Sequence, residues 1–199
     1  MKHPWIVFMT LCSIVLGIVI FCVIFGGYSS LVRSQNRINE AKQLLSDQCT
    51  RQIDLALDLA SAQNSEDFSK TALDLTENAK TLQSVLSQMA EGKTPMTPEV
   101  VAEFQAVENR MAELFSQAIA LIRSDVPSPD PEILDKKAGE MKTDIQQMIR
   151  QYNKEARYFN TRCRVFPVSY AARLFGLDQL HFPEIEIPEN LSGESTHAS

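Results

Sequence analysis

The residues that could carry chemistry are few and stand far apart in the sequence. The three histidines are His3, His181 and His197, and the chain has no His-Glu-x-x-His, Cys-x-x-Cys or Gly-x-Ser-x-Gly motif. Gly92-Lys93-Thr94 matches the end of a phosphate-binding loop, but Ser87 stands where the earlier glycine is required. We therefore interpret this segment as a helix terminator and expect a non-catalytic protein without cofactor or metal.

The four cysteines allow two interpretations. Cys12 and Cys22 lie within an apolar run and are expected to act as small apolar residues. Cys49 and Cys163 could form a disulfide if their helices touched in an oxidising compartment, or they could be buried thiols. We favour buried thiols, because unpaired cysteine is among the residue types most often found in protein interiors.

An uncharged apolar segment near the N-terminus predicts a membrane anchor. It runs from Ile6 to Phe25, and Trp5 and Tyr28 flank it. At about 1.5 Å per residue a helix of this length crosses the roughly 30 Å hydrocarbon core, and rings at both ends suit the headgroup zones. A cleaved signal peptide is the alternative, but its apolar region is usually only about 7–15 residues long. We therefore predict an anchor over residues 1–29 that meets the lipid bilayer through residues 5–28.

These features predict a single-pass protein of the cell (inner) membrane. Lys2 lies on one side of the apolar segment, and Arg33, Arg37 and Lys42 lie on the other. This difference is too small for the positive-inside rule to decide which side holds the rest of the chain. The oligomeric state also stays open, because a small-xxx-small pair in the anchor is compatible with a homo-oligomer.

Beyond the anchor the composition is that of an all-α protein. Glycine occurs 7 times in the whole chain, and no Asn-Gly or Asp-Gly hairpin signal is present. Leu, Ala, Gln, Glu, Met and Lys are abundant, and all are strong helix formers. Setting Lys2 aside leaves 18 basic residues against 25 acidic ones, a formal charge of −7. This charge argues against a nucleic-acid surface, which needs a concentrated basic face.

The apolar periodicity predicts four long helices and one short helix within residues 30–187. The first continues from the anchor to about Gln63, the second opens at Asn64 or Ser65, and the third has Thr97 as its N-cap. The fourth follows the cap Asp130 and extends to about Val165, and a short fifth helix begins at Pro167. Single amphipathic helices are not stable, so we expect an antiparallel bundle, followed by a disordered tail over 188–199.

The most distinctive stretch lies near the C-terminus, where two aromatic-asparagine pairs stand seven residues apart on nearly the same helix face. The stretch resembles the LemA family of bacterial membrane-anchored proteins, whose pattern also contains a Phe-Pro, a Phe-Gly turn and a final aromatic residue. The matching residues are Tyr152, Asn153, Phe159, Asn160, Phe166, Pro167, Phe175, Gly176 and Phe182.

A weaker match to the same family lies on the first long helix. Arg51, Asp54 and Leu55 correspond to its Arg-x-x-Asp-Leu segment, although the usual proline is absent. The middle of the chain departs from the family pattern, so the resemblance is to a divergent member. It implies an N-terminal transmembrane helix and a helical-bundle domain. It implies no particular activity.

The two asparagines have a functional and a structural interpretation. Asn153 and Asn160 could form a recognition surface, or they could be half-buried polar residues that fix helix register, which we favour. Arg51 and Asp54 could form an i, i+3 ion pair, or Arg51 could reach across to Asn160. We predict a scaffold or interaction module that holds protein partners, as yet unknown, at the membrane. A ligand-sensing bundle that acts through a partner is the alternative.

Overall fold

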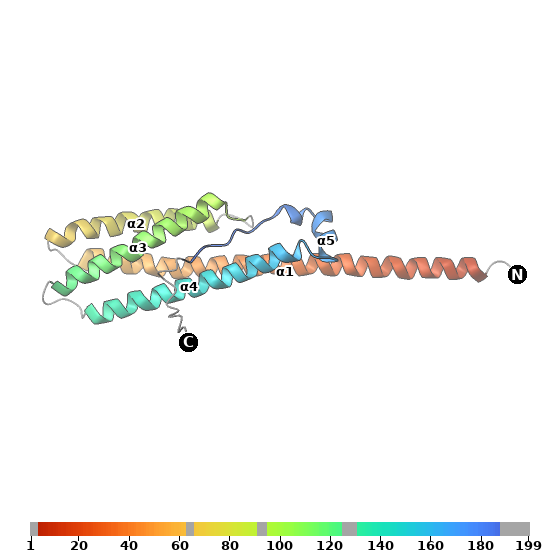
Figure 1. Ribbon diagram of the computed structural model, residues 1–199, viewed down its shortest axis with the longest axis horizontal. Coiled ribbons are helices and arrows are strands. Elements are labelled where there is room, and N and C mark those ends of the chain that lie inside the picture. Colours follow the sequence, from red (N-terminus) through yellow and green to blue (C-terminus); the bar gives the residue numbers. More distant parts are fainter. Residues whose placement is uncertain (1–3, 63–65, 91–94, 125–130, 188–199) are drawn as a thin grey trace, which may run out of the picture.

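The computed structural model of the chain describes residues 4–62, 66–90, 95–124 and 131–187, and these residues form an all-α protein. Four long helices make up the body of the molecule, and a short helix follows them (Figure 1). The helices are α1 (Pro4–Ala62), α2 (Glu66–Ala90), α3 (Pro98–Ser124), α4 (Pro131–Arg162) and α5 (Val168–Leu174), followed by the 3-10 turn η1 (Leu177–Gln179).

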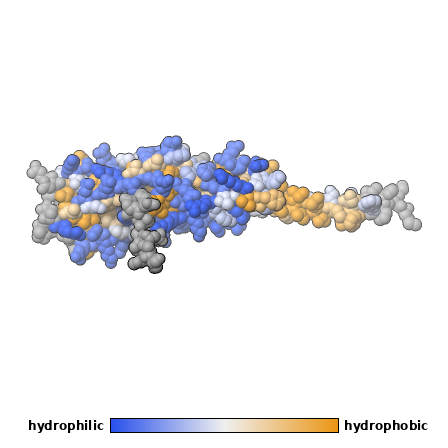
Figure 2. All heavy atoms as spheres, in the orientation of Figure 1, coloured by the Kyte–Doolittle hydropathy of each residue, from blue (hydrophilic) through white to orange (hydrophobic). Residues whose placement is uncertain are grey.

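Helix α1 belongs to two parts of the molecule at once. It runs for 59 residues without interruption, which confirms the prediction that the anchor continues into the first bundle helix. Its N-terminal half projects from the bundle as a single apolar rod (Figures 1 and 2). This half is long and apolar enough to cross a membrane, and its most apolar stretch is not buried by the rest of the protein. From Leu31 onward the inward face of α1 is buried in the bundle.

The four long helices alternate in direction and share one apolar core. Helices α1 and α3 run away from the rod, and α2 and α4 run back toward it (Figure 1). The inward stripes predicted from the sequence are confirmed: Ile38 and Leu45 of α1, Leu82 of α2 and Met111 of α3 are fully buried. Each helix thus buries against its neighbours an apolar stripe that would face water in an isolated helix.

Two helix ends follow from local chemistry. Thr97 caps α3 as predicted, since its Oγ1 accepts from the Val100 N–H over 3.4 Å. Helix α4 was predicted to reach about Val165, and this is wrong, because it ends at Arg162. The N–H groups of Arg164 and Val165 turn to carbonyls three residues back, at 3.0 and 3.3 Å, and the chain then enters the cis Phe166–Pro167 bond. The predicted caps at residues 64–65 and 130 and the predicted disordered tail lie outside the described residues.

The cysteines are all free, and Cys49 and Cys163 are both buried, which confirms the interpretation as unpaired thiols. The Sγ atom of Cys163 lies 3.8 Å from the Leu177 carbonyl oxygen, close to α5. On α1 the residue that packs on α5 is Gly27, and Cys49 lies more than twenty residues further along that helix. Burial raises the pKa of the Cys163 thiol to about 11, and the nearby Asp178 carboxylate adds to this effect.

Candidate functional site

An extended segment of residues 180–187, here called the strap, connects the C-terminal motif to the rest of the bundle. The strap leaves η1 and runs back along α4 on the side that faces α3 (Figure 1). Phe182 and Ile185 are buried, and Gln105 of α3 donates from Nε2 to the Glu186 carbonyl over 3.0 Å. The strap therefore lies between α3 and α4 and contacts both.

Asn153 and Asn160 hold this strap by its backbone. Asn153 Nδ2 donates to the Ile185 carbonyl at 2.7 Å, and its Oδ1 accepts from the Ile185 N–H at 2.8 Å. Asn160 repeats the arrangement with Phe182, at 2.8 Å to the carbonyl and 3.1 Å from the N–H. Each side-chain amide thus pairs with a strap residue as a neighbouring β-strand would. We call these four residues the asparagine clasp.

The spacing of the asparagines is explained by the geometry of the two elements. Seven residues of α-helix rise about 10.5 Å, and three residues of extended chain span about 10 Å. Asn153 and Asn160 can therefore meet Ile185 and Phe182 without distortion of helix or strap. Both asparagines are half-buried, as the favoured interpretation expected. The pair does not fix register between two helices, however, because its partners are on the strap.

The aromatic residues beside the asparagines complete the clasp. Phe159 meets the ring of Phe182 edge-on, with centroids 5.1 Å apart, and both are fully buried. Tyr152 is also fully buried, and its hydroxyl donates to the Pro183 carbonyl at 2.9 Å. Burial, with the charge of Glu184 added, raises the pKa of Tyr152 above its usual range. The family-like motif therefore builds a binding site for the chain's own C-terminal segment.

The remaining motif residues lie at the end of the bundle from which the rod emerges. Phe175 packs on Tyr28 of α1, with ring centroids 4.4 Å apart. Gly176, between α5 and η1, has φ +66°, the left-handed conformation that glycine commonly adopts just beyond the end of a helix. Phe166 precedes Pro167 and is exposed.

The weaker motif on α1 is not part of this arrangement. Arg51 and Asp54 are exposed, and no ion pair joins them among the described residues. The hypothesis that Arg51 reaches Asn160 is wrong, because the end of α4 lies beside Ser30, whose Oγ accepts from Arg162 at 2.9 Å, and Ser30 is 21 residues from Arg51 along the continuous helix α1. Leu55 is partly buried and packs against the core. These residues therefore contribute to the bundle surface and packing rather than to the clasp.

A second feature is a groove between α3 and α4 with a volume of about 240 Å³. Its walls are mainly apolar and come from both helices, and the end of the strap closes one side. Gln52 of α1 and Glu108 of α3 lie among the lining residues. The apolar part of the lining consists of Phe104, Ala112, Phe115, Ile119, Ala138, Ile145, Ile149, Ile185 and Ile187.

Gln52, which is buried, and Glu108, which is half-buried, form a polar pair at this groove. Gln52 Nε2 donates to Glu108 Oε2 over 3.4 Å, while Oε1 of each side chain is buried without a hydrogen-bond partner among the described residues. Burial raises the pKa of the Glu108 carboxyl to about 7, and contacts with Cys49 and Gln52 offset this only in part. The pKa of the Cys49 thiol is also raised, mainly by burial and further by the nearby Glu108 carboxyl.

This pair was missed from the sequence, although a signal for it was present. Gln52 lies three residues after Cys49 and four before Ala56, within the apolar stripe of α1. Glu108 likewise interrupts the stripe of α3, four residues after Phe104 and three before Met111. A polar residue inside an apolar stripe marks a buried polar site, because such residues are rarely buried without a partner.

The described residues contain no group of three His, Cys, Asp or Glu side chains that could hold a metal ion. No protein-family model matches the chain, and no match was found among curated proteins or among solved structures.

Proposed function

We propose that this chain is a single-pass, non-catalytic protein of the cell (inner) membrane whose helical bundle holds a protein partner close to the bilayer, and that it is a divergent member of the LemA family. The observation that carries the proposal is the continuity of α1. One unbroken helix forms both the apolar rod and a core element of the bundle. A continuous helix of this kind keeps the bundle next to the bilayer surface, as a scaffold requires.

The groove between α3 and α4 supports the partner-binding part of the proposal. It is apolar, it lies away from the rod, and the chain's own strap already enters it with Ile185 and Ile187. Apolar grooves of this kind accept amphipathic or extended peptide segments. The strap therefore illustrates how an extended segment with alternate apolar side chains fits there.

Photo-crosslinking of the full-length chain in its native membrane tests this function. A photoreactive residue at Asn109, exposed beside the groove, is compared with one at Leu73, exposed on α2. We expect a defined protein adduct from Asn109 alone. Gly139→Phe should abolish the adduct by filling the groove, because a side chain at Gly139 meets open space. Equal adducts from both positions, or an adduct unaffected by Gly139→Phe, would overturn the proposal.

A ligand-sensing function is the second candidate, and the polar pair at the groove favours it. The unpartnered oxygens of Gln52 and Glu108 suit a small apolar ligand that carries a hydrogen-bond donor. A library of apolar amines and amides would be screened by thermal unfolding of the full-length chain in detergent micelles. A ligand that binds the folded state raises the midpoint, and this rise should disappear in Gly139→Phe. Without any such rise, the sensing function is rejected.

A further inference from the structure

Helix α5 is apolar on two opposite faces. Val168, Ala171 and Ala172 are buried against the bundle and α1. On the other side Tyr170 and Leu174 have exposed fractions of 67% and 66%. Phe166, in the turn before α5, is 74% exposed and meets the ring of Tyr170 edge-on, with ring centroids 6.0 Å apart. Large apolar side chains that are exposed together mark a surface that contacts another protein or a membrane. The outer face of α5 therefore lacks the apolar surroundings that its residues require.

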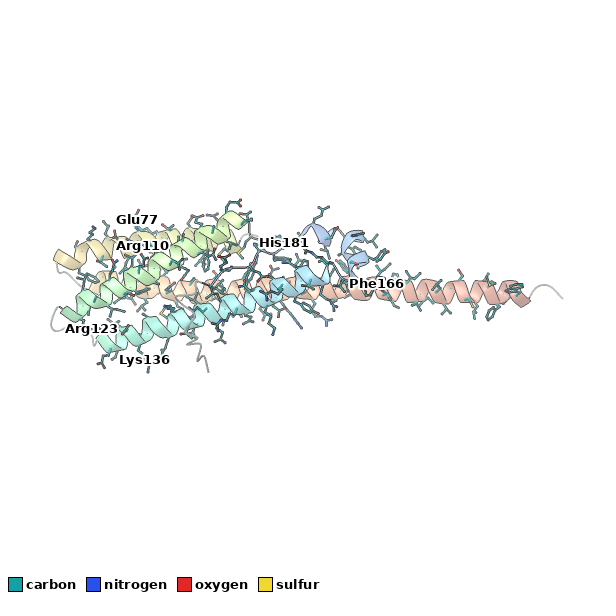
Figure 3. The ribbon with its side chains drawn as sticks, viewed as in Figure 1. Glu77, Arg110, Arg123, Lys136, Phe166 and His181 are labelled. Carbon is teal, nitrogen blue, oxygen red and sulfur yellow. The ribbon has the colours of Figure 1, made fainter. Side chains whose placement is uncertain are left out.

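The position of α5 identifies what those surroundings are. Its inner face packs on Gly27, where a Cβ would lie only 3.1 Å from the Ala171 Cβ, and Phe175 packs on Tyr28. These contacts lie two to three residues beyond Phe25, where the uncharged segment ends, a rise of about 3–5 Å along the helix. Phe166 lies at the end of the bundle next to the rod, whereas Arg123 and Lys136 lie at the opposite end (Figure 3). A bilayer around the rod would thus have its headgroup zone at the level of α5.

The charges beside α5 fit such a surface. Arg164 and Arg173 are exposed, and with His181 and Asp178 they line a polar hollow of about 510 Å³ next to α5. Basic residues near a bilayer surface are attracted to anionic lipid headgroups, and aromatic side chains concentrate at the same depth.

We propose that α5 and the preceding turn are a membrane-docking foot: Phe166, Tyr170 and Leu174 enter the interfacial zone of the bilayer that α1 spans, and Arg164 and Arg173 meet anionic lipid headgroups. This inference rests on the proposed membrane-spanning role of α1. The foot gives the protein a second contact with the bilayer besides the rod. Two contacts fix the tilt and rotation of the bundle, which a single helix leaves free.

Depth-dependent fluorescence quenching tests the foot in the full-length chain. The protein is reconstituted into phosphatidylcholine vesicles containing about a third phosphatidylglycerol, with part of the lipid brominated near the headgroup end of its acyl chains. The native Trp5 is the chain's only tryptophan and reports insertion of the rod. In a Trp5→Phe background, Phe166→Trp reports the foot, and Leu73→Trp on the exposed surface of α2 is the matched control.

We expect the indole of Phe166→Trp to be quenched at least half as strongly as native Trp5, and that of Leu73→Trp not to be quenched. Replacing phosphatidylglycerol with phosphatidylcholine, or adding Arg164→Gln and Arg173→Gln, should weaken the quenching of Phe166→Trp. Quenching of Trp5 together with no quenching of Phe166→Trp would overturn the foot and leave the anchor standing. If Trp5 itself is not quenched, the membrane-spanning role fails, and the foot fails with it.

Discussion

The asparagine clasp and the α3–α4 groove are both polar features of an apolar bundle, but they differ in how their polar atoms are satisfied. In the clasp, each amide of Asn153 and Asn160 uses its oxygen and its nitrogen on the same strap residue. In the groove, Gln52 and Glu108 share one long hydrogen bond, and one buried oxygen of each has no partner within the part of the chain that the structure describes.

This difference has an energetic consequence. A satisfied buried amide contributes to stability, whereas a buried polar atom without a partner costs about 1–3 kcal/mol. The hydrogen bonds of the clasp therefore stabilise the fold by holding the strap in place. In the groove, the Oε1 atoms of Gln52 and Glu108 have no hydrogen-bond partner among the described residues and carry such a cost, which a bound hydrogen-bond donor would remove. Variants can test each half of this comparison.

The largest effect is expected when both arms of the clasp are removed. The double variant Asn153→Ala/Asn160→Ala deletes four hydrogen bonds to the strap, and at about 1 kcal/mol each the free energy of unfolding should fall by about 4 kcal/mol. Urea denaturation of the full-length chain in detergent micelles measures this loss. Faster hydrogen exchange at the Phe182 and Ile185 amides would locate it on the strap.

Asn36→Ala is the matched control for the clasp variants, because Asn36 is exposed on α1. It should leave both the unfolding midpoint and the strap amides unchanged. A double variant that lost no more stability than this control would show that the hydrogen bonds do not hold the strap, and the first half of the comparison would fail.

The second effect concerns Glu108 and depends on pH. Its pKa of about 7 in the folded state lies above the value of about 4.3 in the unfolded chain. The folded state therefore binds the proton more tightly, so stability is greatest below about pH 4.3 and falls as pH rises through 7, by about 3.7 kcal/mol in all. Glu108→Gln cannot ionise, so above pH 7 it should be more stable than the native chain by an amount of this order.

Unfolding curves between pH 4 and pH 8 would measure the effect. Glu103→Gln, at an exposed position of the same helix, is the control and should keep the pH dependence of the native chain. Parallel pH profiles for Glu108→Gln and the native chain would mean that Glu108 is hydrated in solution. The contrast between groove and clasp would then be lost.

The helices were predicted well from the sequence, but the contacts between side chains of different elements were predicted poorly. The stripes of α1 to α4 follow from periodicity, because burial of one helical face leaves a repeating signal in the chain. The seven-residue spacing of Asn153 and Asn160 was also visible, but their partner was not. A side-chain amide can bond to any backbone, and the strap has no periodicity that would reveal it.

The groove shows a second limit of sequence-based prediction. Gln52 and Glu108 each interrupt an apolar stripe, and this can be read from one helix at a time. That the two side chains meet depends on how the bundle places α1 and α3 relative to each other, which no local pattern encodes. The outer face of α5 is similar, since its apolar residues suggest burial until the structure shows them exposed beside the rod.

An effect of about 1 kcal/mol is expected at the turn that leads into the strap. Gly176 has φ +66°, which L-residues with a Cβ adopt only at a cost, so Gly176→Ala should destabilise the chain by about 1 kcal/mol. Gly139→Ala is the matched comparison on the regular helix α4, where the added methyl group meets open space. It should stabilise by about 0.5–1 kcal/mol. Shifts of the same sign would refute this account of the turn.

The smallest effect is expected for the ion pair that accompanies the clasp. Arg157 donates to both carboxylate oxygens of Glu184 on the strap, but their side chains are 71% and 41% exposed, so solvent screens the pair. Arg157→Ala should lower the urea midpoint by less than Asn160→Ala alone. If it lowered the midpoint equally, the clasp would be electrostatic rather than hydrogen-bonded.

The pH dependence of Arg157→Ala provides a further check. The hydrogen bond from Arg157 lowers the pKa of Glu184, so the pair contributes stability above the carboxyl's unfolded pKa and loses it as pH falls below that value. This slope is opposite in sign to that of Glu108. Lowering the pH should therefore weaken the ion pair at the clasp while it removes the unfavourable buried charge of Glu108 at the groove. Arg157→Ala should abolish only the first of these two changes in stability.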